Sequence, residues 1–280
     1  MSVLTQPKID CHHHIFDPAR FPYVADTQYR PEGHELGTAA QYSAVMQAYN
    51  IRHSVIVGPT SGYNTDNRCL LAALAERPGR SKGIAVVPLD IISDELAALK
   101  AQGVVGIAFN VAMLGTAPFL DVDGLMGRLA ELDLFAQVQV MDDQLPALMP
   151  LLKRNRTPLL IDHSGRPDVR AGVGQPAFRA LLSLAGQERT FVKLSGLSKF
   201  SRQAYPWADG HCYQRALLEA FGAERCMWGS DWPFLRANER MDIGSLLLLV
   251  EQLFPDETER EQILWSTPRH LFGFADSLRS

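Results

Sequence analysis

The stretch Lys8-Ile9-Asp10-Cys11-His12-His13-His14 decides both the fold and the position of the chemistry. Side chains of a β-strand alternate between faces, so the pattern predicts Asp10, His12 and His14 on one face and the residues between them on the other. If that face lines a barrel, the two imidazoles lie at the carboxyl end of the strand, where barrel enzymes carry their chemistry. The alternative is an exposed histidine cluster that binds metal only adventitiously.

Apolar, β-branched runs alternate along the chain with segments of helical spacing, and this order predicts a parallel sheet. With the first strand, eight β/α units in 280 residues fit a (β/α)8 TIM barrel of one domain (1–280) better than an open doubly wound sheet, which remains the alternative. The further strands are predicted at 53–58, 82–88, 103–110, 134–140, 158–163, 190–195 and 225–229, and the helices between them at 39–49, 66–77, 93–102, 122–132, 143–155, 175–185 and 213–221.

Two other segments complete the expected architecture. The apolar run 243–254 and the segment 257–274 should cover the outside of the barrel. The piece 16–38 follows the first strand, has no regular periodicity and contains several prolines and glycines. Because so long a loop in a compact domain is usually functional, we expect it to hang over the mouth of the site.

Composition bounds the kind of protein. A hydrophobic fraction of 46% allows a large core, while a net charge of -4 with scattered lysines and arginines indicates neither a nucleic-acid nor a membrane partner. The four cysteines form no CxxC pair, which is typical of reduced thiols in the cytoplasm. The start has no signal-like pattern, and no apolar run approaches a membrane span, so we expect a cytoplasmic protein. Homo-oligomer formation stays open.

Two more strand ends carry titratable side chains. His163 ends one predicted strand, and Asp231 follows another. Alone, His163 could be a satisfied core histidine and Asp231 a turn former before Pro233. Together with the histidines of the first strand they favour a catalytic site, because the carboxyl ends of barrel strands meet at one face.

These residues lie in motifs that resemble the amidohydrolase superfamily. The motifs are Asp10-Cys11-His12-His13-His14, Ile161-Asp162-His163-Ser164-Gly165-Arg166-Pro167 and Trp228-Gly229-Ser230-Asp231-Trp232-Pro233. Within it the chain is most similar to 2-pyrone-4,6-dicarboxylate lactonase-like hydrolases, over nearly its whole length. The resemblance implies a TIM-barrel hydrolase that opens a small anionic lactone in the catabolism of aromatic compounds or sugar acids.

The metal ligands of the superfamily are only partly present. Where metal-dependent members supply a Lys or Glu on the fourth strand or a His on the fifth, this chain has Ala108 to Asn110 and Gln137 to Met141, so no binuclear site is expected. The lactonase branch includes metal-free members, which implies that no cofactor is required. A mononuclear zinc held by His12, His14 and Asp231 is chemically feasible.

Lactone opening needs an activated water, a polarised carbonyl and a proton for the leaving oxygen. We expect Asp231 to be the general base, with its pKa raised by partial burial beside Trp228 and Trp232. His12, His14 and His163 should donate hydrogen bonds to the carbonyl oxygen. Asp162 has the wrong parity to share their face and is expected outside the barrel.

Substrate binding is predicted from polar residues that follow strand ends. The dicarboxylate lactonase pattern has arginines where this chain has Ala108 and, near the end of strand seven, Gly196 to Lys199, so Lys199 is the expected replacement for one lost cation. Each single cation could instead be a solvated loop charge. The candidate contacts are Tyr63, Asn110, Lys199, Arg166, Arg202 and Arg236.

Three alternatives to a lactone hydrolase stay open at this point. A lactone isomerase needs the same groups but returns a lactone. A decarboxylase of the same superfamily demands a bound metal. A barrel retained for binding or structure would show no turnover on lactones.

Overall fold

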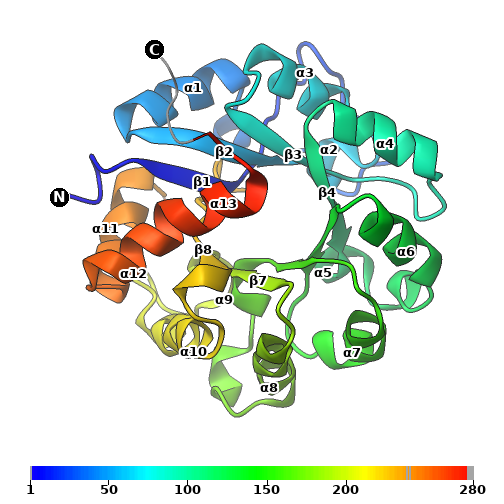
Figure 1. The fold of residues 1–280 in the computed structure, drawn as a ribbon. Helices are drawn as coiled ribbons and strands as arrows, with labels where there is room; N and C mark the ends of the chain where they lie inside the picture. Colours follow the sequence, from blue (N-terminus) through cyan, green and yellow to red (C-terminus); the bar gives the residue numbers. More distant parts are fainter. Residues whose placement is uncertain (1, 238, 240, 276–280) are drawn as a thin grey trace.

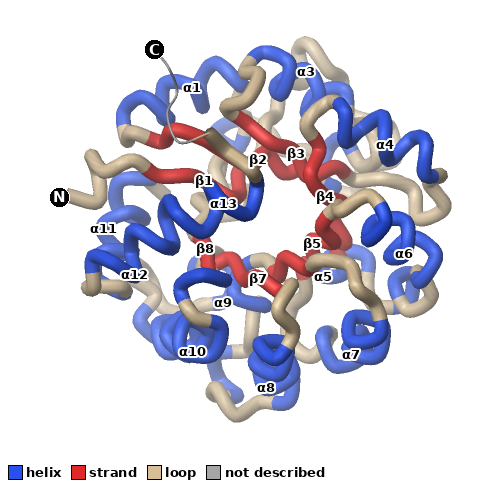
Figure 2. Tube along the Cα trace, in the orientation of Figure 1, coloured by secondary structure: helices blue, strands red, loops and turns tan. Residues whose placement is uncertain are grey.

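The computed structural model confirms the barrel. It describes residues 2–237, 239 and 241–275, and within them eight parallel strands form one sheet in the order β1 to β8. The strands ring the centre and the helices surround them (Figures 1 and 2). The strands are β1 (Lys8–His13), β2 (Ile51–Val57), β3 (Ser81–Ala85), β4 (Val104–Asn110), β5 (Phe135–Gln139), β6 (Leu159–Ile161), β7 (Thr190–Lys193) and β8 (Cys226–Met227).

The helices follow the predicted segments within a few residues. The outer layer consists of α1 (Ala39–Ala48), α3 (Arg68–Glu76), α4 (Ser93–Ala101), α6 (Asp123–Glu131), α7 (Leu145–Arg154), α8 (Pro176–Ser183), α10 (His211–Phe221) and α11 (Ile243–Leu253). Short helices extend three strands at their carboxyl ends: α2 (Thr60–Tyr63), α5 (Val111–Leu114) and α9 (Leu197–Phe200). The last predicted segment forms α12 (Glu257–Glu261), a π-helical turn (Gln262–Ser266) and α13 (Thr267–Phe272).

The core has two parts, as expected for a sheet covered on the outside and filled on the inside. One cluster of buried apolar side chains lies between the strands and the helices. The other fills the barrel and includes Ile9, Cys11 and Leu160 of the strands together with Phe272 and Phe274 of the C-terminal segment. The described residues contain no helix long and apolar enough to cross a membrane. All four cysteines are free thiols.

The barrel closes where β1 meets β8 and the segment that follows it, because β8 itself has only two residues. The amide of Cys11 donates to the carbonyl of Trp228 (3.0 Å), and the amide of Asp231 donates to the carbonyl of His12 (2.7 Å). The close approach requires glycine at 229, because a Cβ there would lie 2.6 Å from the Cβ of His12. Backbone bonds therefore place Asp231 beside His12.

A β-bulge in β1 makes the predicted alternation of side chains wrong at Asp10. Asp10 is opposite Ser54 and His13 is opposite Ile56, so two residues of β1 face one residue of β2. Ile9 and Cys11 therefore face the barrel interior, whereas Asp10 faces outward. The bulge then turns His12 inward, and the expected convergence of His12 and His14 holds without Asp10.

Asp10 forms hydrogen bonds with both carboxylate oxygens across the seam, which is the junction between β1 and the segment after β8. Its Oδ1 accepts from the amides of His12 (3.1 Å) and Ser230 (2.8 Å). Its Oδ2 accepts from the hydroxyls of Ser230 and of Tyr42 on α1. Burial raises the pKa of Asp10, and these hydrogen bonds oppose that rise. One fully buried carboxylate thus connects β1, α1 and the segment after β8.

Asp10→Ala should lower the free energy of unfolding by about 3 kcal/mol, because two buried amides lose their acceptor. Tyr42→Phe removes one hydroxyl donor and should cost about 1 kcal/mol. Urea unfolding of both variants measures the difference. Equal losses in the two would contradict a special role for the carboxylate in the seam.

Candidate active site

A cavity of about 530 Å³ opens at the carboxyl ends of the strands. Its size suits a small molecule. Residues of β2, β4 and β5 and of the segments after β1, β6, β7 and β8 line it, and Gln28 of the 16–38 loop contributes to its wall, as expected for a loop at the mouth.

The four predicted catalytic residues meet at one atom of this cavity. The Nε2 atoms of His12, His14 and His163 lie 3.7, 3.4 and 3.8 Å from Oδ1 of Asp231. His163 reaches this point because β6 ends at Ile161 and the backbone of His163 adopts a left-handed φ of 49°. The structure therefore brings together residues from three strand ends; their roles remain predictions.

The other ring nitrogen of each histidine has its own partner, which restricts the tautomer. Nδ1 of His14 lies 2.8 Å from the carbonyl oxygen of Val57. A carbonyl only accepts, so this Nδ1 carries the hydrogen and a neutral His14 presents a bare Nε2 to Asp231. Nδ1 of His163 lies 3.1 Å from the hydroxyl of Ser195, which can donate to it and leave a hydrogen on Nε2.

The ionisation of Asp231 differs from the prediction. Burial raises its pKa as expected, but the charge of Lys199 and the nearby imidazoles outweigh burial and hold the pKa well below its usual range. Lys199 Nζ lies 2.9 Å from Oδ2 of Asp231. Burial also lowers the pKa of His163, to about 3, against the pull of Asp231. At neutral pH the site thus holds a carboxylate and a neutral His163.

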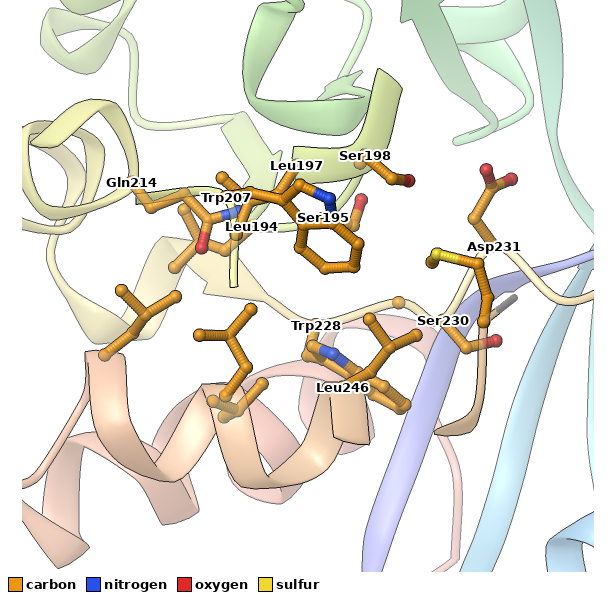
Figure 3. Close-up of a pocket in the computed structure, with 16 residues that line it drawn as sticks. Leu194, Ser195, Leu197, Ser198, Trp207, Gln214, Trp228, Ser230, Asp231 and Leu246 are labelled. Atoms are coloured by element: carbon orange, nitrogen blue, oxygen red, sulfur yellow. The ribbon is translucent and has the colours of Figure 1, made fainter. Parts of the chain in front are cut away.

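Of the two tryptophans expected beside Asp231, Trp228 lines a cavity together with it. This small cavity of about 30 Å³ is separate from the large one, lies behind Asp231 and is also lined by Trp207 and Leu246 (Figure 3). The ring of Trp232 instead packs against Tyr42 of α1, with ring centroids 5.1 Å apart.

Asp162 lies inside the barrel, contrary to the prediction. The expected parity counted His163 as a strand residue, but β6 ends before it, and Asp162 follows the inward alternation of Leu160. Its Oδ1 lies 3.2 Å from Nδ1 of His12 and 3.0 Å from Nζ of Lys193. Lys193 and His12 hold the pKa of Asp162 low although burial raises it.

Sequence reasoning missed Lys193 and Gln137. Both are buried, and Nζ of Lys193 donates to Oε1 of Gln137 at 2.6 Å. The signal was visible as a lysine between Val192 and Leu194 in an apolar strand, because a lysine is almost never fully buried unless paired.

The predicted substrate contacts divide into two groups. Asn110, Lys199, Arg166 and Arg236 line the large cavity. Lys199 is bound to Asp231 and to the carbonyl of Leu235 (2.7 Å), so its ammonium is less free than predicted. In the described part of the chain no carboxylate pairs with Arg166, and its Nε has no hydrogen-bond partner.

Two of the predicted contacts lie elsewhere. Tyr63 is buried with its ring stacked on Phe16, and its hydroxyl accepts from the amide of Asp17. The lining of the large cavity includes Thr60 and Ser61 of α2 but not Tyr63. Arg202 is exposed and lines a separate cavity between α9 and the segment after β8. Neither Tyr63 nor Arg202 is among the residues that line the large cavity, and their contact with substrate stays a prediction.

The residues fit a single metal ion. Ligand atoms of His12, His14 and Asp231 lie within 4.8 Å of one another, and a bare imidazole nitrogen with a carboxylate is a donor set that zinc accepts. Lys199, already paired with this carboxylate, competes with a cation for it. The cluster can thus hold a metal, and the requirement for one is a separate question.

Comparison with known proteins confirms the resemblance found in the motifs. The amidohydrolase family model matches residues 9–274. The chain is 33% identical over 271 residues to 4-sulfomuconolactone hydrolase of Rhizobium radiobacter, covering 94% of this chain and 89% of the relative. It is 26% identical over 267 residues to D-galactarolactone isomerase of Agrobacterium fabrum, covering 94% and 90%.

A solved structure agrees over the whole barrel. The crystal structure of a probable 2-pyrone-4,6-dicarboxylic acid hydrolase from Acinetobacter baumannii, with citric acid bound, superposes with a TM-score of 0.87. Its sequence is 27% identical, and the match covers 96% of this chain and 100% of the other. The chain belongs to the amidohydrolase family.

Proposed function

We propose that this protein hydrolyses a small anionic lactone, with Asp231 as the general base. The observation that carries the proposal is the convergence of an ionised carboxylate and three imidazoles at one point of a cavity that also contains Arg166 and Arg236. The names of the related proteins support the substrate class: one acts on a sulfomuconolactone, and a structural neighbour binds citric acid.

The tautomers of His14 and His163 suggest which residue accepts a proton from water and which donates to the substrate oxygen. Oδ1 of Asp231 and the bare Nε2 of His14 are two acceptors 3.4 Å apart, and a water molecule has two hydrogens to give. Asp231 takes one proton as the water attacks the ester carbonyl. The Nε2 hydrogen of neutral His163 stabilises the oxygen on which negative charge develops. Protonated Asp231 then returns its proton to the leaving oxygen, and the ring opens.

Arg166 and Arg236 bind the anionic groups of the substrate in this proposal. The guanidinium of Arg236 lies over the ring of Tyr29, 4.0 Å from its centroid, and its amide donates to Glu35 at 2.5 Å. The 16–38 loop thereby orients one cation toward the cavity. Arg166 has no ion-pair partner among the described residues. The parallel N–H donors of its guanidinium suit a carboxylate or a sulfonate.

The proposal includes turnover without a metal. A metal bound to His12, His14 and Asp231 would supply a Lewis acid for the carbonyl or for water. The ammonium of Lys199, 2.9 Å from Asp231, already supplies positive charge at the base.

Lactone isomerisation is the second candidate, because a relative that covers 94% of this chain is a galactarolactone isomerase. An isomerase moves the ester to another hydroxyl of the same molecule. Hydrolysis in ¹⁸O-labelled water places one labelled oxygen in the product, whereas isomerisation places none, so mass spectrometry of the product separates the two.

Asp231→Asn should lower kcat on the hydrolysed lactone by about 10² to 10⁴-fold, because the water loses its base. The measurement is steady-state turnover together with circular dichroism to confirm the fold. Asp168→Asn, which removes a carboxylate paired with Arg170 outside the cavity, is the matched control. Near-normal turnover by a folded Asp231→Asn variant would remove Asp231 from the mechanism.

Arg166→Gln should raise KM at least tenfold for a lactone that carries a carboxylate or sulfonate and leave KM for a neutral lactone unchanged, because only the anion loses a charged partner. Arg202→Gln changes the same residue type in the other cavity and should alter neither value. Equal effects of Arg166→Gln on both lactones would argue against an anion contact.

Protein purified without added metal, and then dialysed against a chelator, should keep its kcat within about twofold, because Asp231 and His163 act without a Lewis acid. Elemental analysis of the same samples measures the metal that remains. Loss of activity with the metal, restored by adding zinc, would instead make His12, His14 and Asp231 ligands that turnover needs.

A further inference from the structure

The tautomer of His12 depends on two buried residues that the mechanism has not used. Nδ1 of His12 lies 3.2 Å from Oδ1 of Asp162 and 3.3 Å from Nζ of Lys193. The carboxylate would hold a hydrogen on Nδ1 and leave Nε2 bare, as a metal ligand must be. The ammonium would donate to Nδ1 and leave the hydrogen on Nε2. These two neighbours have opposite consequences for the cavity.

Counting donors and acceptors decides between them. Lys193 is fully buried and has three N–H donors. Oδ1 of Asp162 (3.0 Å) and Oε1 of Gln137 (2.6 Å) take two of these donors. In the described part of the chain, Nδ1 of His12 is the third acceptor within reach. If Nδ1 carried a hydrogen, one N–H of a buried ammonium would lack a partner, which is costly.

Asp162 does not need the hydrogen of His12. Its Oδ1 accepts from Lys193, and its Oδ2 accepts from Nε2 of Gln137 at 2.8 Å. Gln137 joins the two charged groups because its amide oxygen faces Lys193 and its amide nitrogen faces Asp162. The three side chains form a closed network in which one N–H of Lys193 is left over, and that N–H faces His12.

We propose that Lys193 is a positioning residue that fixes His12 with the hydrogen on Nε2, and that it thereby makes His12 a hydrogen-bond donor to the cavity and disfavours a metal at His12, His14 and Asp231. His12 then acts with His163 as a second donor to the developing oxyanion, while His14 remains the acceptor. The tautomer of His12 and its effect on metal binding use no assumption about the lactone, whereas the role of His12 as a donor to the oxyanion rests on the proposed function.

The choice also follows from charge. A cation bound at Nε2 of His12 would lie on a ring whose other nitrogen is 3.3 Å from the Lys193 ammonium, with no solvent between them because both side chains are buried. Removal of Lys193 would leave Asp162 as the partner of Nδ1, and a carboxylate behind an imidazole is the usual support for a metal-bound histidine.

The test is zinc affinity, which needs no turnover. Lys193→Met, which keeps the length and removes the charge and the donors, should bind zinc about 10 to 100-fold more tightly than the native chain in a chelator-competition titration. Lys8→Met is the matched control: Lys8 is equally buried at the start of β1, where it donates to backbone carbonyls, and its replacement should leave zinc affinity unchanged. Unchanged or weaker zinc binding by folded Lys193→Met would overturn the proposal.

A measurement on the native chain covers the case in which Lys193→Met does not fold, since an unpaired buried carboxylate is destabilising. Ring-nitrogen NMR of protein with ¹⁵N-labelled histidine, with His12 assigned by the signals lost in His12→Asn, should show a protonated Nε2 and a bare Nδ1. A bare Nε2 on His12 in metal-free native protein would refute the role of Lys193, and lactone turnover has no bearing on that result.

Discussion

The seam between β1 and the segment after β8 is the constraint on which the site depends. β8 has only two residues, so the barrel closes by backbone bonds from His12 and Cys11 and by the carboxylate of Asp10. The amide of Asp231 donates to the carbonyl of His12, and Asp10 accepts from the neighbouring Ser230. Asp231 and His12 are therefore held by the same few bonds that complete the sheet.

Regular elements were predictable because their signals are local. Apolar runs and helical spacing predicted every strand and the main helices within a few residues, and the ends of the strands predicted which polar side chains meet. Closure of the sheet could be expected only from the number and length of the units. The 16–38 loop was expected at the mouth for its length, but the contact between Arg236 and Tyr29 depends on how two distant loops pack.

Irregular backbone explains the errors. The orientation of Asp10 was wrong because a bulge in β1 adds a residue that the alternation cannot show. Asp162 was placed outside because counting continued through His163, whose positive φ ends the strand pattern. Tyr63 and Arg202 follow strands β2 and β7 at a distance, in or after the short helices α2 and α9, and neither is among the residues that line the large cavity. Counting from a strand predicts a side chain's direction only while the backbone stays extended.

Two ion pairs and two further cations, Arg166 and Arg236, lie among the described residues of the site. Asp231 pairs with Lys199 and Asp162 pairs with Lys193, so each carboxylate is held ionised without any substrate present. An anionic substrate that bound Lys199 would have to compete with Asp231 for the same ammonium. Arg166 and Arg236 also line the cavity, and neither forms a described ion pair with Asp231 or Asp162. In the proposed function, substrate charge and the charge of the base are thus assigned to different residues, so that an anion at Arg166 and Arg236 would leave the ion pair of Lys199 with Asp231 in place.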